Sequence, residues 1–381
     1  MRVLIAGGTG AIGRQLVPLL IARGDDVAVL SRGTKQKEST EARGARTLTA
    51  DALDADELLS AVEAADPDAI VDLMTAIPSP IDPRRIDRDM AATNQLRTTG
   101  TQNLLAAAAA AGVGRVVGES IAFAYDPGEE SVNPEGAALW KSPPRRFAPA
   151  MEALVAHERM IRASGGTVLR FGHLYGPGTA YASDGASADQ VRSGKFPIVG
   201  GGTGVFSFIH VRDAARAIAA ALHSSGGQTL LNIVDDDPAP LSEWLPVYAG
   251  LLGAKKPSKA PAFIARLFAG SYGVAFLTEI RGASNARAKK TLAWQLEYPS
   301  WRDGFAAELG DGQRETVTPG ARLASAAQAA RSPTRRRVRE PATTTVTAPA
   351  NIRLRDSSEL PRSEDGTMNI DVQDTSEGVN A

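Results

Sequence analysis

Short apolar stretches alternate with longer segments of helical periodicity through residues 1–171. The predicted strands are RVLIA (2–6), VAVLS (27–31), RTLTA (46–50), AIVDLM (69–74), RVVGES (115–120) and TVLRF (167–171). The predicted helices cover 11–24, 55–65, 86–111 and 150–163, where apolar residues recur every three or four positions. Strands that are apolar on both faces are typical of a parallel sheet covered by helices. The pattern predicts an α/β fold with a Rossmann-type, doubly wound parallel sheet.

This alternation loosens after residue 172, where glycine and proline become frequent. Strands are still predicted at 206–211 and 229–234, and helices at 213–222 and after 241. We expect a dinucleotide-binding core over 1–172 and a smaller C-terminal substrate lobe over 173–309, interleaved with the core. Residues 310–381 contain no aromatic side chain and are rich in Ser, Thr, Pro and charged residues, so they are predicted to be a disordered tail.

Composition narrows the classes of function. The 381 residues include 42 Lys and Arg and 43 Asp and Glu, so no net charge draws the chain to nucleic acid or to an anionic membrane. Cysteine is absent and there are four histidines, so disulfides and thiolate chemistry are excluded and no metal is expected. The N-terminus does not read as a signal peptide, and no apolar run is long enough for a membrane span. We expect a cytoplasmic protein with a small-molecule substrate, and a homodimer is left open.

The segment GGTGAIG (7–13) follows the first predicted strand and opens the first predicted helix. Glycines at 7, 10 and 13 allow a tight turn and a close approach of the backbone to phosphate, and the helix N-terminus supplies free N–H groups. In this context the motif predicts a pyrophosphate-binding loop that also includes Thr9, Ala11 and Ile12.

The end of the second predicted strand bears on which dinucleotide binds. A carboxylate there would hold an NAD ribose, but the chain has Ser31 and Arg32, and an Arg can accept the 2′-phosphate of NADP. NADP is therefore favoured over NAD, with a solvated Arg32 as the alternative. We place Asp51 near the adenine, or else as a helix cap, and Leu73 beside the cofactor at the end of the fourth strand.

Several segments together resemble an extended short-chain dehydrogenase/reductase of the NAD-dependent epimerase/dehydratase family. They are GGTGAIG (7–13), DALD (51–54), TNQLRTTGTQNLLAAAAAAGVGRVV (93–117), LRFGHLYGPGT (169–179), FIHVRDAARAIAAAL (208–222), NIVDDDPAPLSEW (232–244) and SNARAKKTLAWQLEYPSWRDGF (284–305). The resemblance covers residues 1–309 and implies a Rossmann-type oxidoreductase or epimerase.

One departure from the family concerns its proton relay. In the family, a Tyr on the helix after the fifth strand is the general base, and a Lys four residues later lowers the Tyr pKa and holds the ribose. Alignment of LVAHERM (154–160) with that helix puts Ala150 and Leu154 at these positions, and Tyr-x-x-x-Lys occurs nowhere in the chain. The usual relay is therefore expected to be missing.

Four other residues are candidates for the missing chemistry. Ser120 matches the family's catalytic Ser and would polarise a substrate carbonyl, or it is structural. Tyr125, Tyr175 and His173 are each a replacement acid or a wall of the substrate pocket.

A second departure concerns the substrate. Phe206 and Ser207 stand where nucleotide-sugar enzymes of the family carry an Arg-Asp pair, so a less charged substrate is favoured. We expect an NADP-dependent oxidoreductase or epimerase-like enzyme acting on a carbonyl or sugar-like small molecule. The alternative is an inactive NADP(H)-binding sensor or scaffold.

Overall fold

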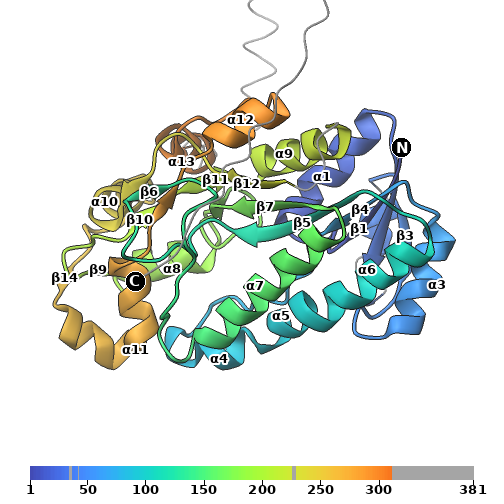
Figure 1. The fold of residues 1–381 in the computed structure, drawn as a ribbon. Coiled ribbons are helices and arrows are strands. Elements are labelled where there is room, and N and C mark those ends of the chain that lie inside the picture. Colours follow the sequence, from blue (N-terminus) through green and yellow to red (C-terminus); the bar gives the residue numbers. More distant parts are fainter. Residues whose placement is uncertain (34–36, 42, 225–228, 311–381) are drawn as a thin grey trace, which may run out of the picture. The chain divides into compact units, whose positions relative to one another are not determined.

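A central parallel sheet organises the protein in its computed structural model, which describes residues 1–33, 37–41, 43–224 and 229–310 (Figure 1). The strand order is β12-β7-β5-β4-β1-β2-β3, and every neighbouring pair is parallel. The strands are β1 (Arg2–Ala6), β2 (Asp26–Ser31), β3 (Arg46–Thr49), β4 (Ala69–Asp72), β5 (Val116–Ile121), β7 (Thr167–Phe171) and β12 (Leu230–Ile233). The order reverses between β1 and β4, so the predicted doubly wound fold is confirmed.

Helices cover both faces of this sheet (Figure 1). One face carries α1 (Ala11–Ala22) and α9 (Val211–His223); the other carries α3 (Ala55–Ala65), α6 (Thr101–Ala110) and α7 (Ala148–Ala163). Side chains of β1 alternate between the two layers: Val3 and Ile5 join the core of α1 and α9, while Leu4 and Ala6 join the core of α3 and α6. This two-sided burial explains why the strands read as continuous apolar runs.

The helix predicted over 86–111 is interrupted in the structure. It consists of α4 (Ile86–Asp89), α5 (Ala91–Gln95), a π-helical turn η3 (Leu96–Gly100) and α6, after a 3-10 turn η2 (Pro83–Arg85). A π-turn inserts one extra residue into a helix, which periodicity over a long window does not detect.

Residues after 172 form small sheets and helices around an aromatic core, and they also complete the central sheet. The small strands after residue 172 are β8 (His173–Tyr175), β9 (Ile198–Val199), β10 (Val205–Phe206), β11 (Phe208–His210), β13 (Ala239–Pro240), β14 (Lys259–Ala260) and β15 (Gly282–Ala283), and β15 pairs with the earlier strand β6 (Val132–Asn133). The remaining helices are α2 (Lys37–Glu41), α8 (Ala186–Arg192), α10 (Leu241–Leu251), α11 (Ala262–Thr278), α12 (Ala286–Leu292) and α13 (Trp301–Gly310). Although β12 and α9 come after residue 172, they lie in the central layers, and interleaving of this kind is part of the sequence prediction. The division at 172/173 itself remains a prediction.

Two further sequence predictions concern the rest of the chain. The predicted disordered tail, apart from Gly310, lies outside the described residues. Within the described ranges no helix is both long enough and apolar enough to cross a membrane.

Candidate active site

The glycine loop forms a close-packed turn between β1 and α1. A methyl group on Gly7, whose φ is +87°, would lie 2.4 Å from the Leu73 carbonyl oxygen, and one on Gly13 would lie 2.3 Å from the Gly8 carbonyl oxygen. Gly10, the N-cap of α1, has only one contact within 4 Å at its Cβ position, at 3.4 Å. The loop thus has the tight turn and the open helix N-terminus that a pyrophosphate needs.

Leu73 and Gly7 also align across the carboxyl edge of the sheet. The Leu73 amide donates to the Ala6 carbonyl at 2.8 Å, which brings the end of β4 against the glycine loop. The structure therefore brings together the predicted loop residues and Leu73.

Arg32 is exposed directly after β2, and no ion pair in the described part of the chain uses it. Asp51 caps the following turn, because its carboxylate accepts from the Leu53 amide at 3.0 Å. Sequence reasoning missed Arg14 in α1, whose Nε donates to the Thr9 carbonyl at 3.0 Å and holds an exposed cation against the loop. The signal was present, since a cation in the first turn of this helix faces any bound phosphate.

On α7, the two predicted relay positions are apolar and buried. Ala150 and Leu154 are 4% and 0% exposed, and both belong to the apolar cluster that includes Phe147 and Met151. No side chain at either position can give or take a proton.

Ser120 and Tyr125 belong to one buried polar cluster around Arg170. Ser120 Oγ donates to Glu158 Oε1 at 2.6 Å, and Glu158 accepts two bonds of 2.7 Å from Arg170. Tyr125 donates to Asn232 Oδ1 at 2.7 Å and accepts from Arg170 Nη1 at 3.2 Å. Burial raises the pKa of Tyr125. The geometry therefore gives Ser120 and Tyr125 structural partners, and their catalytic roles remain predictions.

His173 lies within an aromatic cluster of Phe123, Phe206 and Phe276. Its ring stacks on Phe123 with centroids 4.2 Å apart, and Nδ1 lies 3.3 Å from the Ser207 carbonyl. Burial lowers the pKa of His173 to about 3, so the ring is neutral at pH 7. Phe123 and Phe276 are only half-buried, so the cluster is not fully enclosed.

Tyr175 is buried under α13. A methyl group on Gly304 would lie 1.9 Å from its hydroxyl, and among the described residues this hydroxyl has no hydrogen-bond partner. Burial, reinforced by Asp235 and Asp213, raises the pKa of Tyr175 far above its usual value. Tyr175 therefore stays protonated.

A second polar network ties β4, β5, α6 and α7 together, and sequence reasoning missed it. Thr101 Oγ1 lies 3.2 Å from Asp72 Oδ2 and 2.8 Å from His157 Nδ1, and His157 Nε2 lies 2.8 Å from the Glu119 carbonyl. Arg97 donates to Glu119 Oε1 at 2.8 and 3.2 Å. Burial raises the pKa of Asp72. Charged residues inside the apolar segments at 69–74 and 115–120 were the available signal.

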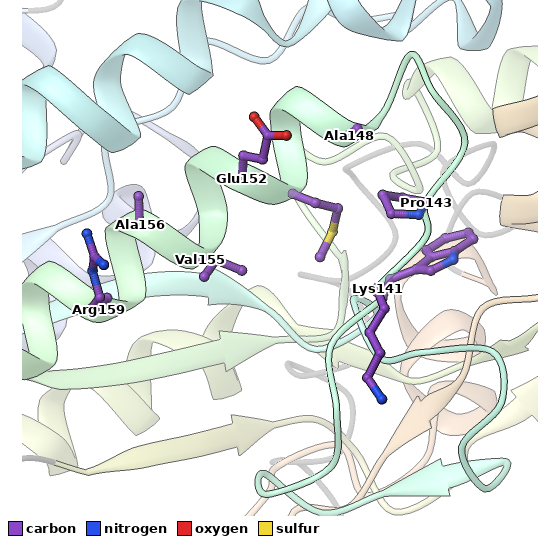
Figure 2. Close-up of a pocket in the computed structure, with 9 residues that line it drawn as sticks. Lys141, Pro143, Ala148, Glu152, Val155, Ala156 and Arg159 are labelled. Atoms are coloured by element: carbon purple, nitrogen blue, oxygen red, sulfur yellow. The ribbon is translucent and has the colours of Figure 1, made fainter.

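A hollow of about 420 Å³ lies along the outer side of α7, away from these groups. Figure 2 shows Glu152, Val155, Ala156 and Arg159 along the helix, with Lys141 and Pro143 on the preceding loop. None of the predicted site residues lines it.

A family model described as the NAD dependent epimerase/dehydratase family matches residues 3–233. The chain belongs to this family.

Two curated relatives are named as reductases. The chain is 44% identical over 316 residues to a 3-diazoavenalumate denitrifying reductase from a Streptomyces species, covering 81% of this chain and 100% of the relative. It is 27% identical over 268 residues to a 4-hydroxy-2-methyl-3-oxo-4-farnesyl-3,4-dihydroquinoline-1-oxide ketoreductase from Stigmatella aurantiaca, covering 67% of this chain and 74% of the relative.

Solved structures of the family share the fold. A UDP-glucose 4-epimerase with UDP-glucose from Thermotoga maritima superposes with a TM-score of 0.66 at 22% identity, covering 84% of this chain and all of that one. A human epimerase family protein with NADPH gives 0.63 at 23%, covering 82% and 100%. The family and its reductase relatives identify an NAD(P)-dependent oxidoreductase or epimerase-like enzyme that uses a nicotinamide dinucleotide.

Proposed function

We propose that this protein is an NADPH-dependent reductase whose substrate accepts a hydride without needing a proton from the enzyme. The observation that carries the proposal is the pair Ala150 and Leu154, buried and apolar at the relay positions of α7. A carbonyl reduced at this place would become an alkoxide with no acid at either of these two positions to neutralise it.

The other candidates for a proton donor are engaged or unsuited. The Ser120 proton is directed to Glu158 and the Tyr125 proton to Asn232. His173 is neutral, and the Tyr175 hydroxyl is packed against Gly304. The missing relay therefore favours a reaction that does not require one.

Reductive loss of a diazo group from an aromatic ring is such a reaction. In an aryl diazonium ion, a hydride forms the new C–H bond while the C–N electron pair leaves with N₂, so no proton is consumed. The relative that is 44% identical is named for this type of conversion, on a substrate that is an acid anion. We propose the same class here: a diazo-substituted aromatic acid, reduced to the corresponding arene.

The residues around His173 suit an aromatic substrate. Phe123 and Phe276 offer half-buried faces to a planar ring, and stacked or edge-on aromatic pairs are favourable. Phe206 is fully buried against His173 and Trp244, and Ser207 is bonded to the Ala283 amide. Neither offers a cation for a nucleoside diphosphate, which argues against nucleotide sugars.

For the cofactor, the glycine loop fits a pyrophosphate because the positions at Gly7 and Gly13 exclude any Cβ. A bound NADPH supplies the hydride. Arg14 would face the pyrophosphate from α1, and Arg32 would accept the 2′-phosphate from the end of β2, which is why NADPH is proposed over NADH.

The test is reduction of a hydroxyaryl diazonium acid by the purified protein with NADPH deuterated at C4. We expect N₂ release, NADP formation and the arene in equal amounts, with deuterium on the ring carbon that lost nitrogen. Aldehydes and ketones form the comparison panel. Turnover of the panel but not of the diazonium acid would identify a carbonyl reductase. Tight NADPH binding with no turnover of any compound would identify a sensor.

A further inference from the structure

Arg97 and Glu119 form a nearly buried ion pair outside the hydrophobic cores. Their side chains are 3% and 12% exposed, and Arg97 donates through Nε and Nη2 to the same oxygen, Glu119 Oε1. Among the described residues no hydrogen bond uses Glu119 Oε2, and this atom is not among the buried atoms without a partner. One carboxylate oxygen is therefore fixed by the guanidinium while the other remains able to accept.

Strand register places Glu119 on the cofactor edge of the sheet. Ala6 pairs with Asp72, and Asp72 pairs with Gly118, so the next residues along these strands, Gly7 and Glu119, lie at the same level. With β4 between them, the backbones of Gly7 and Glu119 are separated by two strand spacings, about 10 Å. Glu119 thus lies on the β5 side of the glycine loop, at the distance expected for the sugar next to a pyrophosphate bound by that loop.

Its neighbours hold Glu119 rigidly. Its carbonyl lies 2.8 Å from His157 Nε2 of α7, and through Thr101 this histidine connects to Asp72. Arg97 comes from the π-turn η3, which packs against α7, the helix that lacks the ribose-binding lysine. A π-turn displaces side chains from a regular helix, and such turns are frequent at functional sites.

We propose that the Arg97–Glu119 pair binds the nicotinamide ribose of the dinucleotide, with Glu119 accepting from the ribose hydroxyls in place of the lysine absent at position 154. The remaining oxygen, Oε2, suits a ribose diol because a carboxylate oxygen can accept hydroxyl protons, as acidic residues do for the adenosine ribose in other Rossmann proteins. Arg97 holds the carboxylate in place through its two hydrogen bonds to Oε1. This inference rests on the proposed NADPH binding.

The test compares two ligands by calorimetry: NADPH, and 2′,5′-ADP, which shares the phosphorylated adenosine but has no nicotinamide ribose. In Glu119→Gln we expect NADPH to bind about ten- to a hundredfold more weakly, the range for losing a hydrogen bond to a charged group. Binding of 2′,5′-ADP should stay within twofold of wild type. Glu152→Gln, the same change on the exposed face of α7, should alter neither ligand.

A double variant, Arg97→Met with Glu119→Leu, removes the pair without leaving a buried charge, and it should show the same selective loss even where Glu119→Gln folds poorly. Unchanged NADPH binding in both variants, or equal loss of both ligands, would overturn the ribose site. If wild type prefers NADH, the same comparison is made with NADH and ADP. A wild type that binds no dinucleotide would instead overturn the proposed function.

Discussion

The hydroxyl of Ser120 donates to the Glu158 carboxylate at 2.6 Å, with both residues buried. Glu158 in turn receives two hydrogen bonds from Arg170, so β5, α7 and β7 meet at one ion pair. From this relationship we predict that Ser120 supports the site internally.

Ser120→Ala should therefore lower stability more than turnover. We expect a loss of about 1 kcal/mol in the free energy of unfolding, because Glu158 keeps Arg170 as its partner, and a turnover within twofold of wild type. Glu158→Gln should cost about 3 kcal/mol or more, since it leaves Arg170 buried and incompletely paired. Urea unfolding and steady-state kinetics measure the two effects. A tenfold loss of turnover in a fully stable Ser120→Ala would restore Ser120 to the chemistry.

Gly10→Asp should abolish dinucleotide binding while leaving the fold intact. The Cβ position has room, and Asp is a favourable helix N-cap, so the loop should keep its shape. Its carboxylate would, however, face the pyrophosphate. Calorimetry should detect no binding of NADPH, while Gly10→Ala, the neutral control, should bind measurably. A Gly10→Asp protein that binds as wild type does would place the cofactor elsewhere.

Arg32 should set the choice between NADPH and NADH. Because its guanidinium is exposed at the end of β2 and used by no described ion pair, we expect Arg32→Ala to weaken NADPH about tenfold or more, the value of one charge-assisted contact. NADH should bind equally to both proteins. The matched control is Arg23→Ala. Arg23 is also exposed, but it directly follows α1 and so lies before β2. Equal weakening by the two variants would indicate a general charge effect.

Tyr175→Phe should leave activity unchanged. The hydroxyl makes no hydrogen bond within the described structure, so its removal leaves no partner unsatisfied. We expect a free energy of unfolding equal to or above that of wild type, and turnover within twofold. A large loss of turnover in a stable Tyr175→Phe protein would show that this phenol donates a proton during the reaction.

His173 should make the protein sensitive to acid. Its pKa is about 3 when folded and about 6.5 when unfolded, so between these values the unfolded chain binds the extra proton and stability falls as pH falls. From pH 7 to pH 5 this single group should cost about 2 kcal/mol. Urea unfolding at the two pH values should show that loss in wild type and a smaller one in His173→Leu. Equal losses in both proteins would mean that the ring titrates normally.

The fold could be predicted because strands buried on both faces leave an unmistakable run of apolar residues, as at 2–6 and 167–171. The glycine loop was equally clear, since Gly7 and Gly13 have no room for a side chain. By contrast, the roles of Arg97 and Glu119 depend on register between strands distant in sequence, and on a π-turn that a helical period does not reveal. The burial of Ser120 against Glu158 likewise depends on how α7 lies across β5. Sequence spacing indicates which elements form, but not which side chains meet between them.

The packing of α1 on α9 constrains the order in which the chain can fold. Leu16 and Leu20 of α1 share one core with Ile218 and Leu222 of α9, although α1 begins at residue 11 and α9 at residue 211. During synthesis α1 leaves the ribosome long before α9 has been made. Its apolar face therefore stays without its packing partner until more than half of the chain has been synthesised. Late closure of such a distant contact slows folding and keeps that face available to chaperones or to other nascent chains. The glycine loop at the head of α1 therefore belongs to a helix that gains its packing partner only after more than half of the chain has been made.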